Sequence, residues 1–357
     1  MKNSELLDLY SDYLISTFGQ ATATGFSGLL RGAVSHDQTQ RWLAGEERTS
    51  ADLWQVVKPQ IRQIESQDGA LIVDDSLVEK PYSDENDLIC WHYDHSKQRS
   101  IKGINFVTAL YHNQGVSLPV GFELVRKTER YLDPKSGKEK RRSTRTKNEM
   151  CRDLLRQAVN NQIPFKYALN DSWFSSAENM NFIKQDLGKD FVMPVKSNRT
   201  LATSLEAKQK GRYQRVDTLS LEPMKAVTVY LKGVEFALFL VTQIFTNEDG
   251  TTGILYLVTS DTTLSGKEMT TIYQKRWNVE LYHKSLKQNV SLEKSPTHTV
   301  RTQTNHFFAS LCGYIKLEFV KGKTQLNHFA LKSKLYLAAL QSAYAAWQEF
   351  HPTTLAA

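Results

Sequence analysis

The sequence predicts an α/β protein, in which helices flank a mixed sheet, a β-rich insertion interrupts it, and both ends are helical. Residues 1–68 show apolar positions at helical spacing without strand alternation, whereas residues 69–196 mix short apolar strands with amphipathic helices. Residues 197–262 are rich in strands, and helical periodicity returns in residues 263–318 and 319–357. We take these five ranges as the predicted parts of the chain.

Composition favours an intracellular protein with a polyanionic partner. The chain has 357 residues, enough for two or three domains, with a net charge of +7 and a pI near 9.1. Its three cysteines lie far apart in the sequence, which excludes a CxxC zinc site and a disulfide framework and suits a reducing cytoplasm. We expect no membrane span, because the apolar runs are too short to cross a bilayer. We also expect no signal peptide, because the N-terminal residues do not fit the pattern of one.

The first 68 residues predict a small helical DNA-binding domain. Ser35–Gln38 fits a capping box that begins a helix, and the segment Gly28–Gly32 comes just before it. Two short helices in this order predict a helix-turn-helix that enters the major groove of DNA. A helical cap that only packs is the alternative. Because Arg31, His36 and Arg41 lie around the turn, we favour DNA binding and expect Arg41 to contact DNA.

Two acidic residues follow short apolar strands of the predicted sheet. Leu71–Val73 reads as a buried strand that ends before Asp75, and Phe165–Leu169 reads as another that ends before Asp171. Where such strands are parallel neighbours, both carboxylates emerge at the same edge of the sheet. We therefore expect Asp75 and Asp171 to lie side by side.

The segment Lys127–Lys147 is strongly basic, with nine Lys or Arg residues against three acids. We expect a mobile loop, because the segment also contains Pro134 and Gly137. A solvated insertion is one interpretation. We favour an arm that grips a nucleic-acid backbone, and the expected contacts within it are Lys140, Arg141, Arg142 and Arg145.

The most informative spacing lies in a predicted helix near residue 280. Its polar face carries four residues that are spaced by three, four and seven positions. They are Tyr273, Arg276, Glu280 and Lys287. At about 100° per residue, these four fall within an arc of about 60°. Upstream, Ser265–Glu268 fits a capping box. A carboxylate between cations suits a site for a metal and phosphates. An ordinary amphipathic helix with a solvated charged face is the alternative.

If this helix packs across the sheet, three carboxylates converge, those of Asp75, Asp171 and Glu280. Three converging carboxylates bind hard divalent cations, and we expect two Mg²⁺ ions, which Mn²⁺ can replace. A metal pair activates a water or a 3′-hydroxyl and stabilises the leaving oxygen of a phosphodiester. The sequence thus predicts metal-dependent phosphodiester chemistry.

The same residues resemble the DDE transposases of bacterial insertion sequences, which have an RNase H-like catalytic domain. The helix matches at every position the signature of one subgroup, Tyr-x2-Arg-x3-Glu-x6-Lys, and the segments LIVDDS and LNDSWF are similar to the first two catalytic segments of that family. The likeness covers roughly residues 70–310. It implies that Asp75, Asp171 and Glu280 form the metal-binding catalytic triad. It favours Asp75 over its neighbour Asp74, because a small hydroxyl residue, here Ser76, usually follows the family's acid.

The resemblance also implies an activity and partners. A cut-and-paste transposase cleaves DNA at transposon ends and transfers the 3′-OH end to target DNA. Tyr273, Arg276 and Lys287 would contact DNA phosphates near the cleaved end. The expected partners are double-stranded DNA, as terminal inverted repeats and target, and a second copy of the chain in the DNA complex. The expected location is the bacterial cytoplasm, at the nucleoid.

Two other functions remain open from the sequence. An RNase H-like metal nuclease, such as a junction or repair enzyme, shares the triad but does not need the signature helix or the long β insertion. A DNA-binding regulator descended from a transposase would not be catalytic. An intact acidic triad argues against the regulator, because a binder gains nothing from three carboxylates facing DNA.

Overall fold

The computed structural model describes residues 2–95, 97–134, 136–246 and 249–350. The chain divides into two units. Unit 1 contains Met1–Thr49, Val78–Asn86 and Tyr282–Ala357, and unit 2 contains Ser50–Leu77 and Asp87–Leu281.

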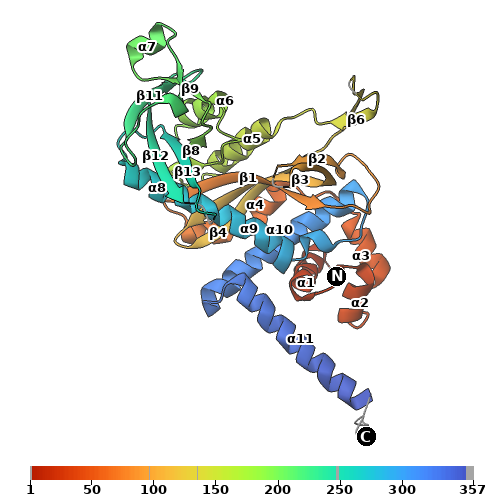
Figure 1. Cartoon of the computed structure of the whole chain (residues 1–357). Helices are drawn as coiled ribbons and strands as arrows, with labels where there is room; N and C mark the ends of the chain where they lie inside the picture. The colour runs from red at the N-terminus through yellow and green to blue at the C-terminus, as the bar shows by residue number, and fades with distance from the viewer. Residues whose placement is uncertain (1, 96, 135, 247–248, 351–357) are drawn as a thin grey trace. The chain divides into compact units, whose positions relative to one another are not determined.

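An 11-stranded mixed sheet organises unit 2 (Figure 1). Its strand order is β10-β9-β11-β12-β13-β8-β7-β1-β3-β2, and β4 pairs with β3. The strands are β1 Ala70–Glu79, β2 Cys90–Asp94, β3 Arg99–Asn113, β4 Val116–Leu124, β7 Tyr167–Leu169, β8 Asp190–Val195, β9 Thr200–Ala202, β10 Gln214–Arg215, β11 Val227–Leu231, β12 Leu238–Thr246 and β13 Thr252–Thr259. β1, β7 and β8 are parallel neighbours, whereas β13 joins β8 in the antiparallel sense.

Helices flank this sheet. They are α4 Ser50–Ile64, α5 Lys147–Asn160, α6 Ala177–Asn181, α7 Leu205–Gln209, α8 Gly266–Gln274 and α9 Asn278–Asn289, which runs on into unit 1. α4 packs against β4, α5 packs against β3 and β4, and α8 packs against β8, β12 and β13. The predicted capping box begins α8, because Ser265 Oγ accepts from the backbone N–H of Glu268 and the Glu268 carboxylate accepts from that of Ser265.

Unit 1 is helical. It contains α1 Asn3–Ser16, α2 Ala23–Leu29, α3 His36–Leu43, α10 Val300–Thr324 and α11 His328–Phe350. One buried cluster joins its N-terminal helices to α10, and its members are Leu6, Tyr10, Tyr13, Leu14, Ala21, Phe26, Val34, Leu43 and Ala309. Apolar positions at helical spacing on α1 supply much of this cluster, as the sequence predicts.

α2 and α3 form two short consecutive helices that contact each other. The turn between them places Arg31 and Gly32 at positive φ angles of 51° and 80°. Such a conformation is easy for glycine and uncommon for arginine. Ser35 caps α3 by accepting from the backbone N–H of Gln38 at 3.1 Å. Two short helices joined by a turn therefore lie where the sequence predicts them, while a helix-turn-helix that binds DNA stays a prediction.

The structure confirms the predicted α/β class, with a mixed sheet, flanking helices and helical N- and C-terminal regions. Two details of the prediction are wrong. β1 does not end before the acidic pair but runs through Asp74 and Asp75 to Glu79. The sequence analysis also missed the strand β2, which lies in the chain between β1 and β3. Within the predicted β-rich range 197–262, β12 and β13 join the main sheet, because β13 pairs with β8. No helix in the described part of the chain could span a membrane.

Candidate active site

Two aspartates lie at matching positions on neighbouring parallel strands of unit 2. The last registered partners of β1 and β7 are Ile72 and Leu169. Asp74 lies two residues beyond Ile72, and Asp171 lies two residues beyond Leu169. Because partners in a parallel ladder advance together, the register brings these two carboxyl groups to the same level of the sheet.

Side-chain and backbone hydrogen bonds fix the end of β7. Asn170 is fully buried, and its Nδ2 donates to the carbonyl oxygen of Val73 at 3.0 Å, which ties the two strands together. The backbone N–H groups of Trp173 and Phe174 donate to Oδ1 of Asp171 at 2.9 and 3.3 Å. These bonds form an Asx-type turn that holds the Asp171 carboxyl in place.

The carboxyl groups at this edge repel one another. Burial raises the pKa of Asp74 well above its ordinary value, and the nearby carboxylates of Asp171 and Asp75 raise it further. Burial also raises the pKa of Asp171, with a further contribution from Asp75. The cation of Arg276 opposes both shifts, because it favours the ionised forms. The site therefore favours a bound positive charge.

Arg276 lies between Asp74 and Glu280. Its Nη1 is 3.2 Å from Oδ2 of Asp74 and 3.3 Å from Oε1 of Glu280. Its guanidinium carbon lies 5.7 Å from the ring centroid of Tyr273, a cation–π contact. Burial raises the pKa of Tyr273 to about 12, so its phenol stays protonated at neutral pH. Three of the four signature residues thus meet Asp74 in one cluster.

Asp75 has other partners. Its Oδ2 accepts from Nζ of Lys147, the first residue of α5, at 2.6 Å and from Nδ2 of Asn105 in β3 at 3.2 Å. Because neighbouring residues on a strand point to opposite faces, Asp74 and Asp75 do not both face Arg276. The geometry favours Asp74 over the predicted Asp75 as the acid nearest Glu280. The catalytic role of either residue stays a prediction.

The signature residues do not lie on one continuous helix, so that prediction is wrong. A 3₁₀ turn at Lys275–Trp277 separates α8 from α9. Tyr273 lies in the last turn of α8, Arg276 lies on the 3₁₀ turn, and Glu280 lies in the first turn of α9. Lys287 follows Glu280 by two helical turns, roughly 10 Å along the axis of α9, and belongs to unit 1.

The carboxylate oxygens of the three acids are of the kind that binds Mg²⁺. Their arrangement does not form a metal site, so metal binding stays a prediction. Asp74, Asp171 and Glu280 offer carboxylate oxygens, which hard divalent cations prefer. Within the described residues, no group of three or more His, Cys, Asp or Glu side chains is placed to hold a metal ion. Arg276 instead contacts two of the three carboxylates. Metal binding by all three acids would require Arg276 to move away from this position.

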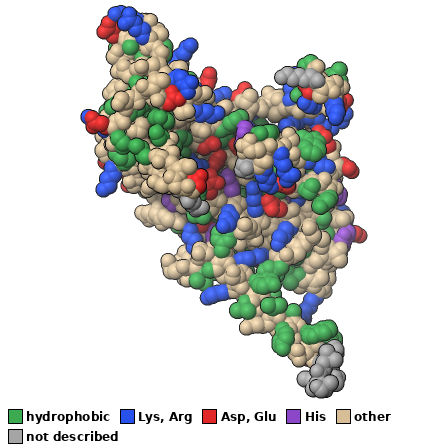
Figure 2. All heavy atoms as spheres, viewed as in Figure 1, with side chains coloured by type: hydrophobic (Ala, Val, Ile, Leu, Met, Phe, Trp, Pro, Cys, Tyr) green, Lys and Arg blue, Asp and Glu red, His purple; other side chains and the backbone are tan. Residues whose placement is uncertain are grey.

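The basic segment between β4 and α5 contains a hairpin rather than the predicted loop. β5 Glu129–Leu132 and β6 Glu139–Arg142 pair in the antiparallel sense. The hairpin projects from the large sheet (Figure 1), and Lys and Arg side chains gather on it (Figure 2). Its cations have acidic partners, in the ion pairs Arg130–Glu139, Lys140–Asp133, Arg141–Asp87 and Arg142–Glu129.

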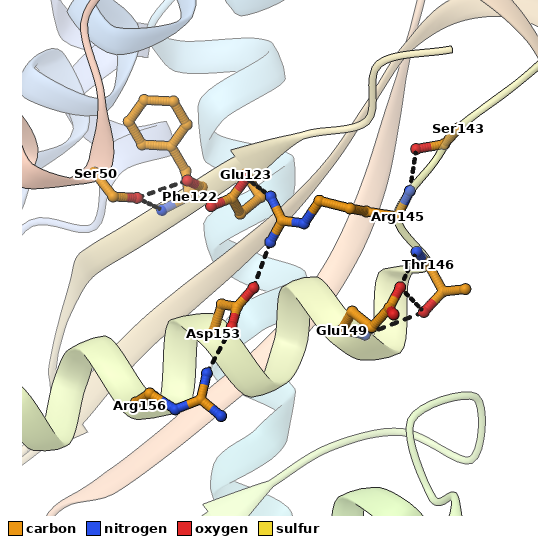
Figure 3. A network of polar contacts seen from close by, with 9 residues as sticks. All are labelled: Ser50, Phe122, Glu123, Ser143, Arg145, Thr146, Glu149, Asp153 and Arg156. Atoms are coloured by element: carbon orange, nitrogen blue, oxygen red, sulfur yellow. Dashed lines mark hydrogen bonds and ion pairs between the residues drawn. The ribbon is translucent and has the colours of Figure 1, made fainter. Parts of the chain in front are cut away.

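Arg145 anchors the base of the hairpin (Figure 3). Its Nη1 lies 3.3 Å from Oε2 of Glu123 in β4, and its Nη2 lies 2.5 Å from Oδ2 of Asp153 in α5. Asp153 also pairs with Arg156 at 2.8 Å. All four hairpin-region cations that the sequence marks as DNA contacts therefore have carboxylate partners. DNA phosphates would compete with those carboxylates, and the DNA contacts stay predictions.

Arg41 lies exposed on α3. Its Nε donates to the backbone oxygen of Asp37 at 3.4 Å. It also lines a pocket of about 330 Å³ in unit 1, together with Gln38, Arg48 and Asn305. The predicted contact of Arg41 with DNA stays a prediction.

Three residues of the site were not found by sequence reasoning. Asn170 gave one signal, its position directly before the strand-end acid Asp171, but its bond to Val73 on the neighbouring strand has no local sequence signal. Lys147 and Asn105 gave none, since they meet Asp75 only through the packing of segments distant in the sequence.

The family model described as a DDE superfamily endonuclease matches residues 3–223, more than half of the chain. The chain belongs to this family. The matched segment contains Asp74, Asp75 and Asp171 and ends before α8, so the signature residues lie outside it. The predicted DDE relationship is confirmed at this level, while the bacterial insertion-sequence origin and the signature subgroup stay predictions.

Among solved structures, one titled "Drosophila P element transposase strand transfer complex" is similar at 10% identity. The alignment covers 97% of this chain and 86% of that chain, with a TM-score of 0.29. No curated protein matches the chain.

The raised pKa of Asp74 predicts a pH-dependent cost in stability. The folded state binds a proton at this carboxyl more tightly than the unfolded state does. The contribution of Asp74 to the free energy of unfolding therefore falls as pH rises from 3.8, its ordinary pKa, through the raised value. We expect Asp74→Asn to raise the free energy of unfolding at pH 7 by about 1 kcal/mol, measured by urea titration at several pH values.

Asp75→Asn is the matched control for this prediction. It removes the neighbouring carboxylate and breaks the ion pair with Lys147, so we expect no gain in stability at pH 7. A loss with Asp74→Asn and a gain with Asp75→Asn would contradict the electrostatic description of the two residues.

The hairpin predicts a salt-dependent effect on DNA affinity. Replacing Lys140, Arg141 and Arg142 with glutamine should weaken binding to every DNA sequence. It should also reduce the slope of log affinity against log salt by up to about 3, because fewer counterions are released. Glu129→Gln with Glu139→Gln breaks two ion pairs of the hairpin, Arg142–Glu129 and Arg130–Glu139, but keeps the cations, so binding should be retained or strengthened. An unchanged slope in the triple variant would make the hairpin a solvated insertion.

Proposed function

We propose that this DDE-family chain is an insertion-sequence transposase. It cleaves DNA at the ends of a transposon and transfers the 3′-OH end to target DNA by a cut-and-paste route. Family membership supports an endonuclease. The observation that carries the proposal further is the cluster in which Arg276 contacts both Asp74 and Glu280, while Asp171 lies close enough to raise the pKa of Asp74.

In this proposal the acidic triad is Asp74, Asp171 and Glu280. Asp74 replaces Asp75, the residue that the resemblance favours, for two reasons. Asp74 shares the register of Asp171 across the parallel strands, and it contacts the same guanidinium as Glu280. Asp75 instead has a structural role, because its partners Lys147 and Asn105 hold β1 to α5 and β3.

We propose that the triad binds Mg²⁺, as two ions, and that Mn²⁺ can substitute. When bound, the metal supplies charge stabilisation for the attacking and leaving oxygens of the phosphodiester. The burial of Asp74 and the turn around Asp171 pre-position two carboxylates, so little side-chain entropy remains to be lost when a cation is bound.

Arg276 has a double role in the proposal. Without DNA it neutralises the acidic cluster. With DNA it is released from Asp74 and Glu280 and contacts a phosphate, since a guanidinium binds phosphate in the same planar geometry as carboxylate. In this proposal the ring of Tyr273 lies against the Arg276 guanidinium, and its phenolic O–H donates to a DNA phosphate. Lys287 on α9 provides a further phosphate contact.

The proposed partners are double-stranded DNA and a second copy of the chain. Terminal inverted repeats would be read by α3, where Arg41, His36 and Gln40 are exposed. The β5–β6 hairpin would contact the DNA backbone. The activity would be exercised on bacterial DNA, in the cytoplasm at the nucleoid.

The triad predicts which variants lose cleavage. Asp74→Asn, Asp171→Asn and Glu280→Gln should each reduce cleavage of an end fragment by about a thousandfold or more, because residues that act as one unit are each required. Binding of the same fragment should stay near that of the parent protein, because DNA affinity comes mostly from backbone contacts elsewhere. A nicking assay with Mg²⁺ and a gel shift on one fragment measure both quantities.

Asp75→Asn separates the two assignments of the first acid. We expect it to keep at least a tenth of the parent cleavage rate. If Asp75→Asn abolishes cleavage and Asp74→Asn does not, the assignment from the sequence is correct and ours is wrong. If all four variants cleave normally, the chain is not a DDE nuclease that uses these residues.

Arg276 predicts a separation between metal binding and chemistry. Arg276→Ala should bind Mn²⁺ at least as tightly as the parent protein, because it removes a cation that competes for two carboxylates. It should nevertheless lose cleavage and joining by about a hundredfold, since the phosphate is no longer held in line. Isothermal titration with Mn²⁺ and a time course on intact and pre-nicked ends test this.

Lys275→Ala is the matched control, because Lys275 lies on the same 3₁₀ turn but donates to the backbone oxygen of Asp68 instead. It should leave cleavage unchanged. A folded Arg276→Ala variant that cleaves and joins at parent rates would show that the guanidinium serves only the acidic cluster.

A further inference from the structure

Exposed aromatic side chains gather beside the candidate active site of unit 2. Trp173 lies two residues after Asp171, and its backbone N–H donates to Oδ1 of Asp171 at 2.9 Å. Trp173 is nevertheless 46% exposed. Its ring centroid lies 5.4 Å from that of His95, and the His95 centroid lies 4.9 Å from that of Tyr93. Three rings from two distant segments of the chain thus lie next to one another, close to one of the acids.

The backbone holds these rings in place while leaving them exposed. Tyr93 in β2 is 53% exposed, and His95, just beyond the strand, is exposed as well. Nε2 of Gln98 donates to the backbone oxygen of His95 at 3.0 Å, and the turn at Asp171 holds Trp173. Large rings that stay exposed on a fixed backbone mark a contact surface, because their burial would be favourable.

A cation accompanies the rings and begins a strongly basic segment. Nζ of Lys196 lies 5.7 Å from the centroid of the Trp173 ring, a cation–π contact. Lys196 comes directly after β8 and begins residues 196–215, which include β9, α7 and β10. This segment has six Lys or Arg residues and one acid, a net charge of +5, whereas the whole chain carries +7. Figure 1 shows α7 at the far end of this part of unit 2, and Figure 2 shows Lys and Arg side chains there.

Aromatic rings followed by cations suit a single strand of nucleic acid. Its unpaired bases stack on the rings, and its phosphates lie along the cations. Duplex DNA keeps the faces of its bases inside the helix, so it would contact the cations and leave the rings unused. An apolar peptide would gain from the rings but not from the cations. The two features together therefore favour unpaired bases.

We propose that Tyr93, His95, Trp173 and Lys196 form a binding site for unpaired bases of single-stranded DNA. Lys196 leaves the face of Trp173 to contact a phosphate, and a base stacks on the ring in its place. The basic residues 196–215 then contact the phosphates that follow. The inference rests on the proposed function for the source of the bases, which is the strand opened beside the cleaved phosphodiester.

The test measures binding of fluorescently labelled oligo(dT), about eight nucleotides long, to the full chain by fluorescence anisotropy. Divalent metal is left out, so cleavage does not contribute. Trp173→Ala should weaken binding by about fivefold or more, because it removes a stacking contact. Trp173→Phe keeps a ring and should stay within about threefold of the parent protein. An abasic oligonucleotide of the same length should bind the parent and Trp173→Ala equally weakly, because it has phosphates but no bases.

Lys196→Gln separates the cation from the rings. It should weaken binding of oligo(dT) and of the abasic oligonucleotide alike. It should also reduce the slope of log affinity against log salt by about 0.7, because one phosphate fewer is neutralised on a single strand. Trp173→Ala should leave that slope unchanged. A merely structural role of Trp173 would not produce this division between the two variants.

Phe245 in β12 provides the matched control. It is an aromatic residue of the same unit and is 44% exposed, close to the value for Trp173. Phe245→Ala should leave the affinity for oligo(dT) within about twofold of the parent value. Circular dichroism and thermal melts show whether each variant is folded. The turn at Asp171 uses only the backbone N–H of Trp173, which the substitutions keep.

Three results would overturn the proposal. The first is an abasic oligonucleotide that binds the parent as tightly as oligo(dT), which would leave only the cations as contacts. The second is a folded Trp173→Ala variant with parent affinity, or an equal loss in Phe245→Ala. The third is a duplex of the same length that binds more tightly than the single strand and depends equally on Trp173. A chain that binds oligo(dT) through Trp173 but cleaves no DNA would contradict the proposed transposase and still support this site.

Discussion

The parallel pairing of β1 with β7 is the interaction on which the candidate site depends. It joins segments about 100 residues apart, and its register sets Asp74 level with Asp171. The apolar residues before Asp74 are fully buried, and a shift of one residue in the pairing would take Asp74 out of level with Asp171. Asn170 closes the same end by donating to Val73. The register therefore fixes the distance between two carboxyl groups before any ligand contributes.

The neighbouring carboxylates repel one another, and this repulsion lowers the stability of the fold. Two cations, on opposite faces of β1, offset part of it. Arg276 reaches Asp74 and Glu280, while Lys147 reaches Asp75. Neither cation is close in sequence to its carboxylates, except that Glu280 follows Arg276 by four positions. The clustered carboxylates thus lower the free energy of unfolding, as is common where a functional site concentrates charge. The surrounding sheet, with β1 and β7 paired on both edges, supplies the rigidity that tolerates it.

Sequence periodicity predicted much of this fold for physical reasons that are local. Apolar runs predict the buried strands, and the capping box of Ser265 and Glu268 predicts the start of α8. The choice between Asp74 and Asp75 was not local, because either neighbour can face the site until the partners on both sides of the sheet are known. The break at Lys275–Trp277 was hidden as well, since residues three positions apart are neighbours both on a 3₁₀ turn and on an α-helix. The acidic partners of the hairpin cations, such as Asp87 and Glu123, lie too far along the chain for any spacing rule to find.

The long separation between the first acid and Glu280 has a consequence for the newly made chain. Glu280 follows Asp74 by 206 positions (280 − 74) and comes after β13 has completed the sheet. At roughly 5–20 residues per second, a ribosome needs about 10–40 s to travel between them. A nascent or prematurely terminated chain can therefore form the β1–β7 pair without α9 and its carboxylate. Synthesis order itself delays assembly of the whole cluster until most of the protein has emerged.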